Sequence, residues 1–114
     1  MPIILALDLG TTGNRTLAFD EHGAMIAQAY LPFTQYTPQP GWVEHDAEEI
    51  WSTCCATIQD VLNQIPIDDI VGLGITNQRE TVVMWDTQTS TPLHRAIVWQ
   101  CRRTHDICQH LQSE

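Results

Sequence analysis

Residues 8–15 of the chain read Asp-Leu-Gly-Thr-Thr-Gly-Asn-Arg and directly follow the apolar run Ile3–Leu7. The pattern predicts a buried strand that runs into a turn of small residues, with the carboxylate of Asp8 at the junction. Because glycine leaves the backbone uncovered, such a turn can bring its N–H groups close to a phosphate. Asp8 then lies where a Mg²⁺ ion carrying that phosphate would lie. We interpret the segment as a nucleotide-phosphate loop, although the same residues also fit an ordinary hairpin turn.

The absence of lysine narrows the type of phosphate loop. A Walker A loop and a protein kinase each need a lysine to hold the phosphates, and the chain contains none. A dinucleotide fingerprint is also excluded, because Gly10 and Gly13 do not complete G-x-G-x-x-G. There remains a strand–turn–strand loop in which hydroxyls and backbone amides hold the phosphates and an aspartate handles the metal.

A second polar segment, Thr76-Asn77-Gln78-Arg79-Glu80, follows the apolar run Ile70–Ile75. Ligands of open α/β sheets collect at the carboxyl ends of strands. Glu80 can accept hydrogen bonds from two hydroxyls of a polyol, and Arg79 can donate to their lone pairs. The spacing alone favours a solvated turn with a local ion pair of little energy.

Trp99 follows the short apolar run Ala96–Val98. A tryptophan there can form the apolar wall of a site for a small carbon skeleton, or it can belong to the core. The other three tryptophans are assigned to packing: Trp42, Trp51 and Trp85.

The composition excludes several classes of partner. The chain has 114 residues, one domain's worth, and a net charge of −9. This charge argues against nucleic acid and anionic membranes as partners. The N-terminal apolar run is too short for a membrane span and lacks a basic start, so no leader or membrane insertion is predicted, and a cytoplasmic location is expected.

The four cysteines are expected to be small buried side chains and not disulfides: Cys54, Cys55, Cys101 and Cys108. Cys101, His105 and Cys108 could share one helix face and hold zinc, but no fourth ligand follows at a familiar interval.

The hydrophobic pattern predicts an α/β domain. Strands are expected over residues 3–7, 15–19, 24–31, 70–75, 81–85 and 96–99, and helices over residues 47–64 and 102–112. The strand at residues 70–75 is expected to be buried, and the proline-punctuated residues 32–40 are expected to be irregular. The first three strands should form an antiparallel meander, and residues 81–85 should pair back onto residues 70–75. Asp46 and Glu49 form a capping box at the start of the first helix. These elements indicate a mixed sheet with helices packed on it.

The chain resembles the N-terminal portion of glycerol kinases, members of the FGGY family of carbohydrate kinases. Four segments carry the resemblance in the family's order: Ala6-Leu7-Asp8 with Gly10-Thr11-Thr12, residues 40–46 (Pro-Gly-Trp-Val-Glu-His-Asp), residues 74–81 (Gly-Ile-Thr-Asn-Gln-Arg-Glu-Thr) and residues 96–104 (Ala-Ile-Val-Trp-Gln-Cys-Arg-Arg-Thr). The segments around Arg79 and Trp99 favour glycerol kinases over relatives that act on pentoses or gluconate.

The resemblance implies a ribonuclease-H-like, actin-like ATPase fold and Mg·ATP-dependent phosphorylation of glycerol to glycerol 3-phosphate. It implies that the nucleotide phosphates are bound by Thr11, Thr12, Gly13 and Arg15, and that Asp8 holds Mg²⁺ through water. It also implies that Arg79 and Glu80 bind glycerol hydroxyls and that Trp99 packs on the carbon face of glycerol. ATP and Mg²⁺ are the expected cofactors, and glycerol and ATP/ADP the expected partners; a homo-oligomer is compatible with the sequence.

The chain departs from the family at Leu9, where a glutamine is usual, and at Gly13-Asn14, where a serine pair is usual. The general base, a substrate-binding tyrosine and the adenine site of the family come later than residue 114. We therefore expect residues 1–114 to be the N-terminal part of the first kinase domain, without a catalytic base or second domain, and inactive alone. The alternatives are a non-catalytic, kinase-like binding or regulatory module and a kinase for another small polyol.

Overall fold

The computed structural model describes residues 1–113 and consists of two compact units. Unit 1 contains residues 1–33 and 48–78, and unit 2 contains residues 34–47 and 79–114. The elements in chain order are β1 (Ile3–Leu9), β2 (Gly13–Phe19), β3 (Met25–Pro32), β4 (Glu44–His45), α1 (Ala47–Leu62), the 3₁₀ turn η1 (Ile67–Asp69), β5 (Ile70–Asn77), β6 (Ala96–Ile97) and α2 (His105–Gln112). No helix among the described residues is long and apolar enough to cross a membrane.

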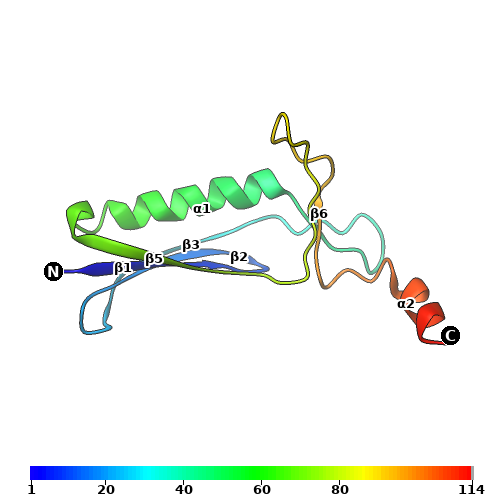
Figure 1. Ribbon diagram of the computed structural model, residues 1–114, viewed down its shortest axis with the longest axis horizontal. Helices are drawn as coiled ribbons and strands as arrows, with labels where there is room; N and C mark the ends of the chain where they lie inside the picture. Colours follow the sequence, from blue (N-terminus) through cyan, green and yellow to red (C-terminus); the bar gives the residue numbers. More distant parts are fainter. Residues whose placement is uncertain (114) are drawn as a thin grey trace. The chain divides into compact units, whose positions relative to one another are not determined.

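Unit 1 is built on a four-stranded mixed sheet of order β3-β2-β1-β5 (Figure 1). β1 pairs with β2 and β2 with β3 in antiparallel fashion, whereas β1 and β5 are parallel. The predicted antiparallel meander is therefore confirmed. The parallel pairing follows from the crossover through α1, because parallel neighbours need a long connection between them.

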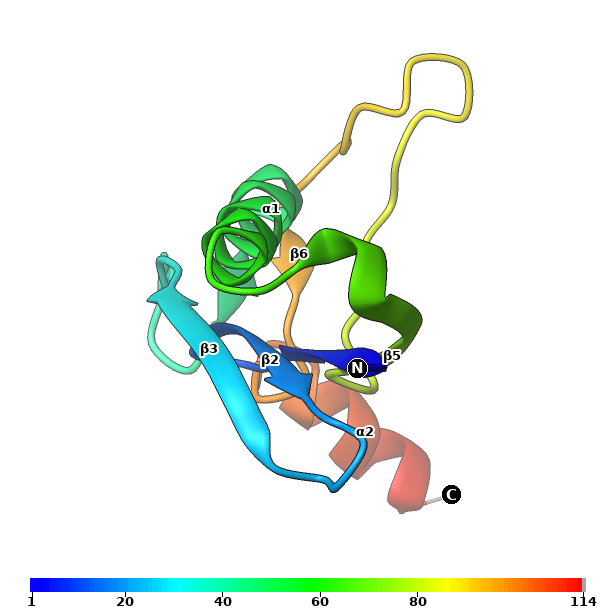
Figure 2. The ribbon, with the colours of Figure 1, turned by 90° about the vertical axis from the view of Figure 1, so that its left-hand side faces the viewer.

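Helix α1 lies along one face of this sheet (Figures 1 and 2). It begins at the predicted residue and ends two residues before the predicted end. Its buried side chains recur at helical spacing, Cys54, Thr57 and Val61. They face the sheet side chains that share the core of unit 1: Ile3, Leu5, Ala18, Ala27 and Ala29.

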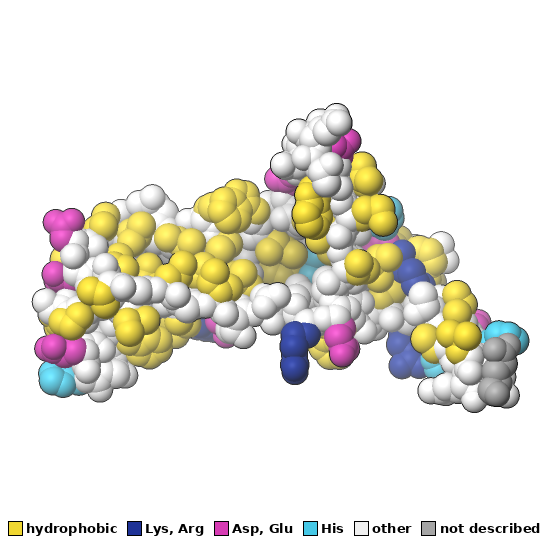
Figure 3. Space-filling view, in the orientation of Figure 1, with side chains coloured by type: hydrophobic (Ala, Val, Ile, Leu, Met, Phe, Trp, Pro, Cys, Tyr) yellow, Lys and Arg dark blue, Asp and Glu magenta, His cyan; other side chains and the backbone are white. Residues whose placement is uncertain are grey.

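β5 is an edge strand, and the prediction that it is buried is wrong. Its apolar residues Val71, Leu73 and Ile75 are 69%, 54% and 63% exposed. The register aligns Leu73 and Ile75 with Leu5 and Leu7 of β1, so they point to the face on which α1 lies, beside the area that the helix covers. Figure 3 shows hydrophobic side chains gathered over this part of unit 1. The apolar run correctly indicated a strand but not its burial. An apolar run of this kind can form an edge strand or a central strand, and its composition does not distinguish the two positions.

Unit 2 has little regular structure. Its two strands, β4 and β6, are two residues long and pair in antiparallel fashion. The proline-punctuated segment before β4 is irregular as predicted, apart from a bridge between Tyr36 and Glu44. α2 begins at His105, three residues later than predicted.

The predicted pairing of residues 81–85 with residues 70–75 is wrong. Val82 instead exchanges both backbone hydrogen bonds with Ile97, at 3.0 and 2.9 Å, and Trp85 bridges to Pro92. The pattern correctly indicated extended chain, but the partner of an extended segment is decided by tertiary packing that the pattern does not contain.

Several predicted core side chains are exposed. Trp51 and Trp85 are 65% and 54% exposed, and only Trp42 is partly buried. Cys54 is buried, Cys101 is partly buried, and Cys55 and Cys108 are exposed. The assignment of these residues to packing therefore holds for Cys54 and, in part, for Cys101 and Trp42.

Candidate functional site: a phosphate loop and a polyol-binding segment

The predicted phosphate loop is the turn between β1 and β2. Leu9 and Asn14 form the last strand pair, and the Gly10 N–H donates to the Gly13 carbonyl at 3.1 Å across the turn. The Thr12 carbonyl accepts a hydrogen bond from the Phe33 N–H at 3.3 Å. The loop is thus closed by its own backbone and attached to the chain that follows β3.

Gly13 is required by the close approach of β3. A Cβ atom at this position would lie 2.5 Å from the Leu31 carbonyl oxygen and 2.5 Å from the Tyr30 hydroxyl oxygen. Both distances are below any real Cβ contact, so a serine or alanine here would displace backbone. Asn14 is in β2 and contributes structurally, because its buried Nδ2 donates to the Ile50 carbonyl and to Thr53 Oγ1, each at 2.8 Å.

Asp8 and Arg15 are cross-strand partners beside the loop, and Asp8 is also in register with Thr76 of β5. Their side chains point to the face of the sheet opposite α1, because their neighbours Leu7, Asn14 and Thr16 point to the helix. Asp8 is exposed at the carboxyl end of its strand. It can therefore reach a cation beside the loop.

Two residues of β3 hold Arg15, and the sequence analysis missed both. Arg15 Nη1 donates to Gln28 Oε1 at 2.9 Å, and its guanidinium carbon lies 4.9 Å from the centroid of the Tyr30 ring. The signal was present in the expected meander, because residues 28 and 30 alternate onto one face of a strand that pairs with residue 15. Gln78 also contacts the loop, as its Nε2 donates to the Gly10 carbonyl at 3.4 Å.

The predicted polyol-binding residues belong to unit 2. Arg79, Glu80 and Trp99 are exposed, and the Trp99 N–H donates to Thr81 Oγ1 at 3.3 Å. The backbone of Trp99 therefore lies next to the segment that carries Arg79 and Glu80. Glu80 has a φ of +61°, an unfavourable left-handed conformation for a residue with a side chain. Such strain persists only where the surroundings impose it, and it is enriched at functional sites.

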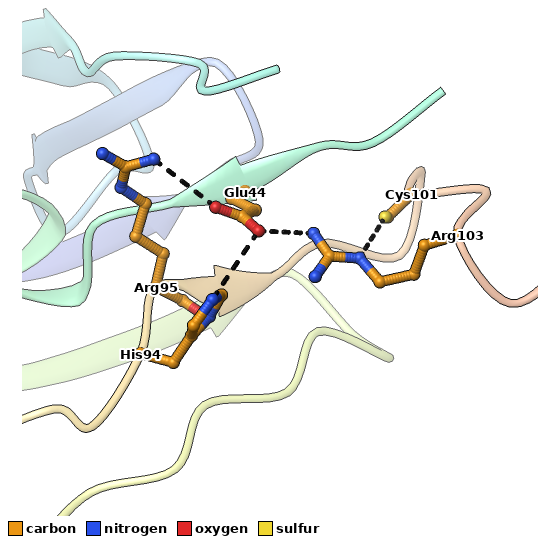
Figure 4. A network of polar contacts seen from close by, with 5 residues as sticks. All are labelled: Glu44, His94, Arg95, Cys101 and Arg103. Carbon is orange, nitrogen blue, oxygen red and sulfur yellow. Dashed lines mark hydrogen bonds and ion pairs between the residues drawn. The ribbon is translucent and has the colours of Figure 1, made fainter. Parts of the chain in front are cut away.

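The buried carboxylate of Glu44 contacts residues that precede Trp99 and a residue that follows it in the sequence. Its side chain is 4% exposed and contacts three cationic groups: Arg103 Nη2 at 2.5 Å, Arg95 Nη1 at 3.5 Å and, when it is protonated, His94 Nε2 at 3.9 Å. Figure 4 shows Arg103 between Glu44 and Cys101, with Arg95 and His94 on the other side of the carboxylate. We call these residues the Glu44 cluster.

Two aromatic rings fix the arginines of the Glu44 cluster. The Arg103 guanidinium carbon lies 3.9 Å from the Trp42 ring centroid, and that of Arg95 lies 3.8 Å from the Tyr36 ring centroid. Stacking on a ring leaves the N–H groups of a guanidinium free to reach the carboxylate edge-on. The backbone of Glu44 also pairs with Ile97 in β6. Glu44 thus contacts, through its side chain and its backbone, the chain segments that precede and follow Trp99 in the sequence.

The charges of the cluster shift its pKa values. The hydrogen bond from Arg103 lowers the pKa of Glu44 against the opposing effect of burial. Burial favours the neutral form of Arg103, but the hydrogen bonds and charge interactions with Glu44 and Cys101 together outweigh burial and raise the pKa of Arg103. Burial also opposes ionisation of Cys101, yet hydrogen bonds from Arg103 lower the pKa of its thiol overall. All three shifts favour the ionised cluster.

The described residues contain no group of three or more His, Cys, Asp or Glu side chains that could hold a metal ion. An all-protein metal cage is therefore not formed by residues 1–113. Asp8 alone fits a different kind of site, because Mg²⁺ commonly binds through one or two carboxylates, waters and substrate phosphates.

The chain belongs to the FGGY family of carbohydrate kinases, whose N-terminal domain matches residues 3–114. It is 53% identical over 113 residues to a glycerol kinase of Trichormus variabilis and 50% identical over 113 residues to a glycerol kinase of Brevibacillus brevis. The matched region is 97% of this chain and 23% of each of these relatives. The chain thus spans about a quarter of the length of the curated relatives it matches.

Solved structures confirm the predicted fold. A Plasmodium falciparum glycerol kinase with ADP is 32% identical and superposes with a TM-score of 0.86 over all of this chain and 23% of its own. A xylulose kinase from Lactobacillus acidophilus, only 19% identical, superposes with a TM-score of 0.92 over 99% of this chain and 23% of its own. The mixed sheet with its antiparallel meander and flanking helix therefore has the ribonuclease-H-like, actin-like architecture of these sugar kinases.

Proposed function

We propose that the native gene product containing this chain transfers the γ-phosphoryl group of ATP to a terminal hydroxyl of glycerol, giving glycerol 3-phosphate and ADP. The observation that carries the proposal is the loop at Gly10–Gly13, a tight turn closed by its own backbone hydrogen bond, with a carboxylate and an arginine beside it. The relatives of the same family named glycerol kinase support the choice of reaction.

The nucleotide contacts are assigned to unit 1. In this proposal Thr11, Thr12, Gly13 and Arg15 bind the phosphates through hydroxyl, amide and guanidinium donors. Asp8 would hold a Mg²⁺ ion through water, and that ion would supply charge neutralisation at the phosphates. Phosphoryl transfer depends mainly on such positioning and electrostatic stabilisation.

The polyol contacts are assigned to unit 2. Arg79 and Glu80 bind adjacent glycerol hydroxyls, and Trp99 packs on the carbon chain. The strained backbone at Glu80 supports this role, because the strain has no benefit for stability. The general base is proposed to lie outside residues 1–114, in the remainder of a longer kinase of which this chain is the N-terminal part.

The test is transfer of γ-³²P from labelled ATP to glycerol by the native gene product, purified from its source cells and weighed by intact mass spectrometry. We expect a polypeptide several times longer than this chain and sustained formation of labelled glycerol 3-phosphate. ATP binding without transfer to glycerol would support a non-catalytic binding module instead. Transfer to another small polyol in preference to glycerol would change the substrate and keep the reaction.

A further inference from the structure

Tyr30 contacts the phosphate loop at three points. Its hydroxyl lies 3.2 Å from Thr12 Oγ1, and it lies in the space that a side chain at Gly13 would occupy. Its ring lies under the guanidinium of Arg15, its register partner across the β2–β3 ladder. Three of the four proposed phosphate-binding residues therefore meet one tyrosine, whose side chain is on a different strand from all of them.

Packing alone does not account for this position. Tyr30 is 42% exposed, so its ring gains only part of the free energy of full burial. It lies on the face of the sheet opposite α1, the face that Arg15 shares. The hydroxyl and the ring are each directed at a group that the proposed function uses.

The contacts are those expected of a preorganised anion site. An arginine has five N–H donors, and Gln28 accepts one hydrogen bond from Arg15. Stacking on Tyr30 restricts the arginine without using its other donors. The Tyr30 hydroxyl similarly restricts the rotation of the Thr12 hydroxyl. A ligand that binds to side chains already ordered loses less conformational entropy on binding.

We propose that Tyr30 is a further residue of the nucleotide site, which orders Thr12 and Arg15 for the polyphosphate of a nucleoside di- or triphosphate. The inference rests on the proposed function of the loop. It assigns no bond-making role to Tyr30, which acts through its two neighbours.

The experiment is calorimetric titration of the native gene product with ATP, inorganic tripolyphosphate and adenosine. Tyr30→Phe keeps the ring and loses the hydroxyl, whereas Tyr30→Leu loses both. We expect the Kd for ATP and tripolyphosphate to rise about fivefold in Tyr30→Phe and about tenfold or more in Tyr30→Leu, with adenosine affinity unchanged. Ile26→Ala is the matched control, since Ile26 is similarly exposed on the same strand, at the bulge near the end of β2 away from the loop.

A second experiment, in the Arg15→Lys variant, distinguishes a positioning role of Tyr30 from a general structural role. Arg15→Lys keeps the charge and loses the planar group that stacks on the ring. In this background we expect Tyr30→Leu to weaken tripolyphosphate binding less than about threefold, because the two residues are coupled. A merely structural role would give the same loss in both backgrounds.

Two results overturn the inference, and they are distinguishable from failure of the proposed function. Wild-type binding of tripolyphosphate that Tyr30→Leu leaves unchanged, or a loss shared equally by adenosine, removes Tyr30 from the nucleotide site and leaves the loop assignment standing. A wild-type protein that binds neither ATP nor tripolyphosphate overturns the proposed function, and this inference with it.

Discussion

The interiors of the two units contain different kinds of contact. The core of unit 1 is apolar, and the buried side-chain hydroxyls of Thr16 and Thr57, which are neutral, bond to each other at 2.9 Å. The interior of unit 2 contains an ionised carboxylate, Glu44, whose charge is paired with Arg95 and Arg103.

The cysteines report the same difference. Burial, with a smaller effect of Cys55, raises the pKa of Cys54 in unit 1. Burial acts in the same direction on Cys101 in unit 2, but there the hydrogen bonds from Arg103 prevail. A sheet covered by a helix can be stabilised by apolar burial, whereas a unit with two-residue strands depends on specific ionic contacts.

The largest effect is expected from Glu44→Gln. The substitution leaves Arg103, whose side chain is 14% exposed, without its anionic partner. Breaking one side of a buried ion pair destabilises by about 3 kcal/mol. Amide hydrogen exchange at Val82 and Ile97 should accelerate, while exchange in β1 and β2 should not change. Glu21→Gln is the control, because Glu21 forms only an exposed contact with His22. Equal acceleration in both units would contradict a separate role for the Glu44 cluster.

Acid should loosen unit 2 before unit 1. The folded state lowers the pKa of Glu44 below its ordinary value of 4.5. A lowered folded pKa contributes stability that is present above pH 4.5 and is lost as the pH falls through the folded value. In unit 1 the pKa of Asp20 is also lowered, mainly by the hydrogen bond from the Ala24 N–H in a surface turn. Hydrogen exchange measured stepwise below pH 4.5 checks the order; earlier loss of protection in β1 would contradict it.

A smaller effect is expected from Thr57→Val in unit 1. The substitution removes one partner of a buried hydrogen bond and leaves the Thr16 hydroxyl unsatisfied, at a cost of about 1–2 kcal/mol. Replacing both threonines by valine should cost less than the sum of the two single substitutions, because no unpaired hydroxyl then remains. Urea unfolding of the three variants measures this difference. Strict additivity would show that the two hydroxyls do not interact.

The smallest effect on stability is expected from Glu80→Gly. Removing the side chain relieves the left-handed strain, and after the larger unfolded-state entropy of glycine is subtracted the gain is about 0.5 kcal/mol. The KM for glycerol should rise at the same time. Ser90→Gly is the matched control, since Ser90 has a φ of +59° and should give a similar gain with no change in KM. Loss of stability in Glu80→Gly would show that the Glu80 side chain has a structural role.

The sequence predicted unit 1 well and unit 2 poorly, for a physical reason. Local periodicity and turn residues determine the β1–β2 hairpin and α1, and these were found within two residues at most element ends. The pairing of Val82 with Ile97 and the exposure of β5 depend on distant partners, which periodicity does not specify.

The sites follow the same rule. The Asp8-to-Arg15 motif indicated the phosphate loop, because its residues are consecutive. Tyr30 and Gln28 were not predicted, because only the strand register brings them to Arg15. The ion pairs of Glu44 could not be predicted from the sequence either, because its partners Arg95 and Arg103 are more than fifty residues away along the chain.

The central claim is that unit 1 binds the nucleotide and unit 2 the polyol. Its most direct test is the KM for ATP and the KM for glycerol in the native gene product carrying Arg15→Gln or Glu80→Gln. We expect Arg15→Gln to raise the KM for ATP about tenfold or more with little change for glycerol, and Glu80→Gln to do the reverse. A rise in the KM for glycerol in Arg15→Gln, with the KM for ATP unchanged, would contradict the assignment of the two units.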